Sequence, residues 1–373
     1  MSHLFSPFTL NAPRGSLTLP NRIVVAPMCQ YSADQGQATD WHLAHWAQML
    51  NSGAGLFIIE ATGVEPRGRI STHCLGLWDD ATAAALSDRL HRARRLAPHV
   101  PVCIQLGHAG RKASSDLPWQ GGQLLSPEAG GWPTCAPSAI PHLPQEPAPH
   151  ALTEAELHDV AQAFVQAAQR AEHMGIEAVE LHGAHGYLLH QFLSPIANQR
   201  TDAYGGNFEN RTRFPLEVFQ AVRAAFKGTL GMRLSATDWV EGGITPEDTA
   251  DFCLRLKQAG ADFVHISSGG VSPAQKIAIG PEYQVPFAKL VKQKTGLPTI
   301  AVGLVTDPHQ AEDILARGDA DMVALARAFL YQPRWGWQAA AALKGQVQAS
   351  APYWRCLPAS AGHIFSDAKV GQR

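Results

Sequence analysis

The sequence predicts a (β/α)8 TIM barrel with an N-terminal hairpin, a capping excursion after the third strand and a C-terminal tail. Apolar segments of strand length alternate with helix-like segments eight times along the 373 residues. The apolar segments are rich in Val, Ile and Leu and show little alternation, which is typical of parallel strands covered on both faces. No G-x-G-x-x-G pattern follows any of them, which argues against an open dinucleotide-binding sheet.

The strands and several helix starts can be placed along the chain. The eight predicted strands are residues 22–28, 55–61, 102–106, 178–182, 230–235, 262–267, 298–303 and 321–326. Thr153-Glu-Ala-Glu156 is a capping box, and Leu152 with Leu157 can form its hydrophobic staple. Thr245-Pro246 and Asp307-Pro308 each place a capping residue before a proline at the first helical position.

Two segments do not fit the repeat and are expected to be irregular. Residues 110–150, with a proline-rich second half, are predicted to pass over the barrel mouth after the third strand. Residues 189–210 form a polar, glycine-rich stretch after the fourth strand. Long irregular connections in compact domains tend to be lids or binding loops, so both segments are expected to border the active site.

The two ends of the chain complete the predicted domain. Residues 1–20 are expected to form a short hairpin or plug before the barrel, and residues 351–373 an appended tail. We expect one domain over residues 1–373, with the barrel at about 21–345. Residues 346–373 would then be free to contact a neighbouring subunit.

Composition and charge argue against several classes of protein. With 30 basic and 32 acidic residues, the net charge of -2 gives no electrostatic reason to bind nucleic acid or an anionic membrane. No apolar run is long enough to span a bilayer, and no secretion signal is evident, so we expect a cytoplasmic protein. The six cysteines contain no C-x-x-C pair, which argues against the usual zinc and iron–sulfur spacings.

The most informative motif is His182-Gly-Ala-His-Gly-Tyr187, at the end of the fourth strand. Active-site groups of TIM barrels gather at these strand ends. The histidines could be satisfied by backbone carbonyls, or they could bind zinc with His108 or Glu60 as a further ligand. They could also hold a substrate oxyanion as a pair of hydrogen-bond donors. We favour the donor pair, because Tyr187 can supply a proton but rarely binds zinc.

Other strand ends carry groups suited to a phosphorylated cofactor. Gly303 and Arg327 follow the seventh and eighth strands, where barrels frequently bind phosphate. A flavin phosphate held there would place the ring over the centre of the barrel. Cys29, after the first strand, is either a small buried hydrophobe or a thiol that tunes the flavin.

Gln105 and Arg233 lie on the third and fifth predicted strands. A buried arginine is costly without an anionic partner. Arg233 could form an internal salt bridge with Glu60 or Asp238. It could instead face the N1/C2 edge of a flavin, with Gln105 on the pyrimidine edge, and we favour this arrangement.

Together these residues resemble the old yellow enzyme family of flavin-dependent ene-reductases, and most closely its thermophilic-like branch. The resemblance extends over essentially the whole chain. The segments that carry it are Ala26-Pro-Met-Cys-Gln-Tyr31, Gln105-Leu-Gly-His-Ala-Gly-Arg-Lys-Ala113, Glu180-Leu-His-Gly-Ala-His-Gly-Tyr-Leu188, and Phe192-Leu-Ser-Pro through Arg200-Thr-Asp-Ala-Tyr-Gly-Gly206.

The resemblance implies FMN as bound cofactor and NADPH or NADH as hydride donor. The residues implied to hold FMN are Ala26, Pro27, Met28, Cys29, Ala61, Gln105, Arg233, Gly303, Ala326 and Arg327. His182 and His185 would bind the carbonyl of an α,β-unsaturated substrate. Tyr187 would donate the proton to the α-carbon, and Tyr31 would line the substrate side. Hydride would pass from the nicotinamide to flavin N5 and then to the substrate β-carbon.

The resemblance also implies small-molecule enones as substrates, nitro compounds as a second candidate class, and a homodimer or homotetramer. The branch often lends a C-terminal residue to a neighbouring active site, and Tyr353-Trp-Arg355 is the candidate here. An ordinary anchor on its own barrel is the alternative for this triplet. The chain has Ala326 where the family usually has glycine before the arginine, which we expect to be tolerated if φ is negative.

Two functions from other classes compete with this one. A metal-dependent barrel hydrolase would use the histidine pair but lacks an obvious third ligand. An RNA-modifying flavin barrel would share the cofactor but needs a basic surface, which the charge balance does not favour. Related dienoyl reductases carry an iron–sulfur cluster, for which the cysteine spacings here are unsuitable.

Overall fold

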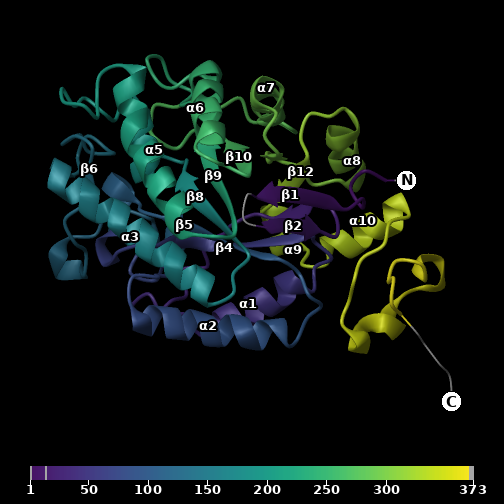
Figure 1. Cartoon of the computed structure of the whole chain (residues 1–373). Helices are drawn as coiled ribbons and strands as arrows, with labels where there is room; N and C mark the ends of the chain where they lie inside the picture. Colours follow the sequence, from purple (N-terminus) through teal and green to yellow (C-terminus); the bar gives the residue numbers. More distant parts are fainter. Residues whose placement is uncertain (1, 13–14, 369–373) are drawn as a thin grey trace.

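Eight parallel strands close into a barrel, which confirms the predicted fold class (Figure 1). The structure is a computed structural model that describes residues 2–12 and 15–368. Every predicted strand is present, with ends shifted by a few residues. The barrel strands are β3 (Ile23–Val25), β4 (Leu56–Gly63), β5 (Val102–Gly107), β8 (Ala178–Gly183), β9 (Thr229–Ser235), β10 (Phe263–Ser267), β11 (Thr299–Ala301) and β12 (Met322–Leu325).

Helices surround the barrel and cover the outer faces of its strands (Figure 1). They are α1 (Asp40–Leu50), α2 (Asp80–Arg94), α3 (Glu154–His173), α4 (Leu188–Leu193), α5 (Phe208–Ala225), α6 (Pro246–Gln258), α7 (Val285–Thr295), α8 (Pro308–Ala316), α9 (Arg327–Tyr331) and α10 (Trp335–Leu343). The three predicted helix starts are confirmed. Thr153 Oγ1 accepts the Glu156 amide at 3.3 Å, and Thr245 and Asp307 cap α6 and α8 in the same way. These bonds satisfy amides that have no partner within the helix.

The predicted N-terminal hairpin closes the bottom of the barrel. Strands β1 (Phe8–Ala12) and β2 (Gly15–Leu19) pair antiparallel. Leu10 and Leu19 are fully buried and join one apolar cluster with interior barrel residues such as Met322. Because this end is filled by side chains, polar groups that face the barrel interior can meet a ligand only at the opposite end, where the strands finish.

The segment at 189–210 differs from its prediction, because its start is helical. All six residues of α4 (Leu188–Leu193) are buried. The leucines and Phe192 pack into the main core, and His190 and Gln191 find buried hydrogen-bond partners. The rest of the segment is irregular until α5 begins at Phe208. The excursion at 110–150 contains only short 3-10 turns, together with the two-residue strands β6 (Cys135–Ala136) and β7 (His150–Ala151).

The C-terminal tail packs on its own barrel, beside α10 (Figure 1). The Phe365 and Tyr353 rings lie 4.9 and 5.5 Å from the ring of Trp337. Arg355 is exposed, whereas Tyr353 and Trp354 are half-buried. The final predicted residues, 369–373, lie outside the described part of the chain.

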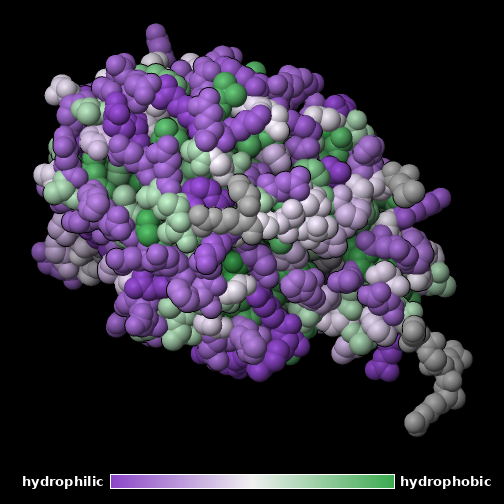
Figure 2. Space-filling model, in the orientation of Figure 1, coloured by the Kyte–Doolittle hydropathy of each residue, from purple (hydrophilic) through white to green (hydrophobic). Residues whose placement is uncertain are grey.

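The face that carries the hairpin mixes hydrophilic residues with small, separated hydrophobic areas (Figure 2). None of the helices within residues 2–12 and 15–368 is both long and apolar enough to cross a membrane. A cytoplasmic location stays a prediction.

Candidate active site

The predicted site residues lie at the carboxyl ends of the barrel strands. Because all eight strands are parallel, these ends share one mouth of the barrel. The structure places the predicted cofactor residues on or just after six strands: Ala26, Pro27, Met28 and Cys29 after β3, Ala61 on β4, Gln105 on β5, Arg233 on β9, Gly303 after β11, and Ala326 and Arg327 after β12. Tyr31 follows β3 at the same end.

The motif after β8 brings its two imidazoles and its phenol together. The His182 ring centroid lies 5.2 Å from that of His185 and 4.8 Å from that of Tyr187. His185 and Gly186 both have left-handed backbone, with φ values of +58° and +75°. A Cβ on Gly186 would lie 2.1 Å from the carbonyl oxygen of Gly270, so glycine is required there. The turn thus gathers the three side chains at the barrel mouth.

Both histidines are held in the neutral form. Burial lowers the pKa of His182 and of His185 well below the usual value, and the charge of Arg233 lowers each pKa further. His182 Nδ1 accepts the Ala184 amide at 3.3 Å, so its proton lies on Nε2. His185 Nε2 shares a hydrogen bond of 2.8 Å with Ser267 Oγ. His182 can therefore donate its Nε2 proton to a carbonyl oxygen, and His185 can do so through Nδ1 when Ser267 Oγ donates to its Nε2.

Tyr187 remains a protonated phenol beside the ammonium of Lys112. Burial raises its pKa well above the usual value. The Lys112 ammonium lies 5.3 Å from the Tyr187 ring centroid and donates to the carbonyl of His185 at 2.9 Å. Burial, together with the charge of neighbouring Arg111, lowers the pKa of Lys112 to about 8. A protonated phenol in this position can serve as a proton donor.

Arg233 is a buried guanidinium that forms no ion pair with any described residue. Its side chain is 7% exposed, and its Nε has no hydrogen-bond partner. The alternative of an internal salt bridge from Arg233 to Glu60 or Asp238 is wrong, because both carboxyl groups lie beside histidines. Glu60 lies 3.5 Å from His42, and Asp238 lies 2.8 Å from His190. An unpaired buried cation is costly, so this position fits an anionic or strongly accepting ligand.

A buried carboxylate organises the floor of the mouth beneath this cation. Glu180 on β8 accepts from Gln105 Nε2 at 2.6 Å and pairs with His265 Nδ1 at 2.9 Å. The other ring nitrogen of His265, Nε2, has no hydrogen-bond partner in the described part of the chain. Because the side-chain amide nitrogen of Gln105 donates to Glu180, the orientation of this amide toward a ligand is fixed.

The residues predicted to bind the cofactor phosphate follow β11 and β12. Gly303 has φ +134°, and a Cβ there would press on Gln284 at 3.2 Å. Ala326 has φ -110°, which is the negative φ under which its methyl group is expected to be tolerated. Arg327 begins α9 with an exposed side chain. The unpaired Arg233, the Gly303 backbone and the Arg327 cation together fit an elongated cofactor with an anionic end, such as FMN.

Cys29 and Tyr31 lie beside the buried carboxyl group of Glu60. Burial raises the pKa of the Cys29 thiol and of the Tyr31 phenol, so both stay protonated. Burial also raises the pKa of Glu60 to about 8, although its Oε2 accepts the Gln30 amide at 2.8 Å. The Tyr31 ring packs edge-on against Trp119 of the excursion, with centroids 5.9 Å apart.

The residues considered for a metal site have other partners. His108 Nε2 pairs with Glu65 at 2.7 Å. Burial opposes its charge, but Cys135 and Glu65 raise the pKa of His108 to about 9. In the described part of the chain, no three His, Cys, Asp or Glu side chains are grouped as metal ligands.

Comparisons with known proteins agree with this arrangement. A family model described as NADH:flavin oxidoreductase / NADH oxidase matches residues 3–346. The chain belongs to this family. It is 44% identical over 359 residues to an NADPH dehydrogenase of Geobacillus thermodenitrificans, and the alignment covers 94% of this chain and 98% of that protein. It is 42% identical over 350 residues to the NADH:flavin oxidoreductase FG08077 of Gibberella zeae, covering 88% of this chain and 83% of the relative.

Solved structures of this family have the same architecture. Morphinone reductase superposes with a TM-score of 0.74 at 27% identity, over 99% of this chain and 94% of that one. The resemblance to the old yellow enzyme family is therefore confirmed. So are the enzyme class, an NAD(P)H-dependent flavin oxidoreductase, and the cofactor FMN.

Several residues of the site had no predicted role. Lys112 lies within a segment quoted for the resemblance, yet nothing local indicates that its amine reaches the His185 carbonyl. The sequence points more clearly to Glu180, since a carboxylate within an apolar strand is unusual and suggests a specific role. His190 and Asp238 are 48 residues apart, so their contact becomes visible only in the folded chain.

Proposed function

We propose that this flavin oxidoreductase reduces the activated C=C bond of α,β-unsaturated carbonyl compounds with NADPH or NADH. The observation that carries the proposal is the cluster of two neutral imidazoles and one protonated phenol beside an unpaired cation. These are the groups that would bind a carbonyl, supply a proton and stabilise negative charge. Enones are the proposed substrates, and nitro compounds are a second class of acceptor.

FMN, when bound, supplies the hydride, which it takes from the nicotinamide and gives to the substrate β-carbon. Arg233 would bind its electron-rich edge, because this buried guanidinium has no anionic partner among the described residues. Gln105 would donate to or accept from the pyrimidine edge. The Gly303 backbone and Arg327 would bind the phosphate, and the remaining residues predicted after β3, on β4 and at Ala326 would surround the ring.

His182 and His185 would hold the substrate carbonyl oxygen. As neutral donors they gain strength when negative charge develops on that oxygen, so they favour the transition state over the bound substrate. Tyr187 would deliver its phenolic proton to the α-carbon, on the side opposite to the hydride, and regain a proton from solvent. Tyr31 would border the substrate, with Trp119 of the excursion behind it.

We also propose that the protein forms a homodimer or homotetramer. Its other partners would be small-molecule substrates. Arg355 would be the group that reaches a neighbouring subunit, because it is exposed. Tyr353 and Trp354 pack instead on their own chain.

The test of this function is the absorbance spectrum of the purified protein under anaerobic conditions. The protein should be yellow, should bleach when NADPH or NADH is added, and should regain its colour when cyclohexenone is added. A colourless protein that does not bind added FMN, or a reduced protein that cyclohexenone does not reoxidise, would contradict the proposal.

A further inference from the structure

The peptide bond between His185 and Gly186 is held from both sides by ionisable side chains. Lys112 Nζ donates to the His185 carbonyl at 2.9 Å. On the other side, His190 Nδ1 accepts the Gly186 N–H at 2.8 Å. Both residues of this peptide have left-handed backbone. The clamped peptide follows His185 and precedes Tyr187 by one residue in the chain, so its orientation affects where both side chains lie.

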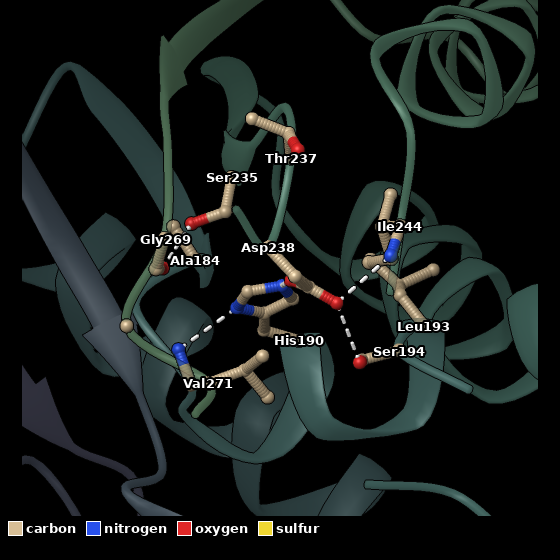
Figure 3. Close-up of polar contacts among 12 residues, drawn as sticks. Ala184, His190, Leu193, Ser194, Ser235, Thr237, Asp238, Ile244, Gly269 and Val271 are labelled. Carbon is tan, nitrogen blue, oxygen red and sulfur yellow. Dashed lines mark hydrogen bonds and ion pairs between the residues drawn. The ribbon is translucent and has the colours of Figure 1, made fainter. Parts of the chain in front are cut away.

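His190 is itself fixed by a buried carboxylate (Figure 3). Its Nε2 lies 2.8 Å from Asp238 Oδ1, and neither side chain is exposed. Because Nδ1 accepts from Gly186, the ring proton must lie on Nε2, which donates to Asp238. Ser194 Oγ and the Ile244 amide donate to the other carboxylate oxygen at 2.7 and 2.8 Å. Burial raises the pKa of Asp238, but its three donors lower it overall, so the group stays ionised.

We propose that Asp238 and His190 are positioning residues for the active-site turn. Asp238 fixes the tautomer of His190, and His190 holds the Gly186 amide and thus the orientation of the two groups that flank it. A buried carboxylate sets the tautomer of a histidine in the same way in serine proteases. The inference rests on the proposed function, because it takes His185 and Tyr187 as the groups that face the substrate.

The pair also links two strand ends. His190 lies on α4 after β8, whereas Asp238 lies in the loop after β9, the strand that carries Arg233. The turn that would bind substrate is therefore held by the loop that follows the cation proposed to bind flavin. A misplacement of about 1 Å at reacting groups can cost about 100-fold in rate, so a linkage of this kind has a measurable consequence.

Asp238→Asn tests the tautomer directly. The amide NH2 of asparagine cannot accept from His190 Nε2–H while its oxygen serves Ser194 and Ile244. His190 would shift its proton to Nδ1, where it would oppose the Gly186 N–H. We expect nitrogen NMR of labelled histidine to show the other tautomer at position 190. We also expect faster hydrogen exchange over residues 183–191.

A matched pair at position 190 separates positioning from folding. Asparagine carries its amide oxygen on Cγ, where histidine carries Nδ1, so His190→Asn can still accept the Gly186 N–H. His190→Leu cannot. Reoxidation of the reduced flavin by cyclohexenone should slow by about 100-fold in His190→Leu, and His190→Asn should recover much of this loss. Bleaching by NADPH should change little in either variant. Ser194→Ala, which removes a different bond to Asp238, should resemble the wild type.

Several outcomes would overturn the positioning role. One is that Asp238→Asn changes neither the hydrogen exchange over residues 183–191 nor the tautomer of His190. Another is equal reoxidation rates in His190→Asn and His190→Leu. If Asp238→Asn does not fold, the position-190 pair decides. If the wild type does not react with cyclohexenone at all, the proposed function fails, while the tautomer and exchange measurements still test the clamp on the turn.

Discussion

His182 and Arg233 lie directly opposite each other in the parallel ladder between β8 and β9. Paired residues in a sheet project to the same face, so both side chains enter the barrel mouth together. The charge of Arg233 is one cause of the lowered pKa of His182. The register of these two strands therefore places a neutral donor beside an unpaired cation, which is the arrangement that the proposed reaction needs.

His182→Ala should reduce the stabilisation of the transition state without abolishing flavin binding. Removal of one donor to a developing oxyanion costs about 3 kcal/mol, so kcat/KM for cyclohexenone should fall by about 100-fold. The rate of bleaching by NADPH should stay near that of the wild type. Turnover of cyclohexenone at the wild-type rate would show that His182 does not hold the carbonyl.

Tyr187→Phe keeps the ring that packs against His182 and removes only the phenolic proton. General-acid groups typically contribute about 100-fold or more, so the reoxidation step should slow by a similar factor. The comparison to make is stopped-flow reoxidation of the two reduced proteins by the same enone. If the variant keeps the wild-type rate, solvent supplies the proton and Tyr187 has another role.

Arg233→Met should act in opposite directions on stability and on cofactor affinity. The guanidinium is buried without an ion pair to any described residue, so an apolar side chain of similar length should stabilise the flavin-free protein by about 1–3 kcal/mol. FMN affinity should fall, because the flavin loses its cation. Thermal unfolding without FMN and a fluorescence titration with FMN measure the two effects. A destabilised flavin-free variant would mean that Arg233 has a protein partner after all.

Glu60→Gln should change how stability depends on pH. Burial raises the pKa of Glu60 from 4.5 to about 8, so the folded state holds this proton more tightly than the unfolded state. Its stabilising effect is complete below pH 4.5 and is lost as the pH rises toward 8, at up to about 1.4 kcal/mol per pH unit. Glu60→Gln cannot lose that proton, so its melting temperature should fall less than that of the wild type between pH 5 and 9. Parallel curves for the two proteins would place the pKa of Glu60 near its ordinary value.

The sequence was sufficient to predict the barrel because each strand is a separate apolar run whose type is visible locally. It was less informative where a buried segment contains polar residues. α4 was missed because His190 and Gln191 lie between its leucines and Phe192, and their partners are distant in sequence.

The same limit applies to the site. The residue types at the strand ends predicted which side chains would gather at one mouth, because parallel strands bring their ends together. They could not decide whether Arg233 is paired, since Glu60 and Asp238 were both plausible partners. Only the folded chain shows that His42 lies beside Glu60 and that His190 binds Asp238.

In the proposed reaction, the C=C bond and not the carbonyl group receives the hydride. The most direct test is to identify the product of an anaerobic reaction between the protein, NADPH and cyclohexenone. We predict cyclohexanone as the product, formed in a ratio of one molecule per NADPH oxidised. Formation of the allylic alcohol, or NADPH oxidation that consumes no enone, would show that the protein does not reduce the C=C bond.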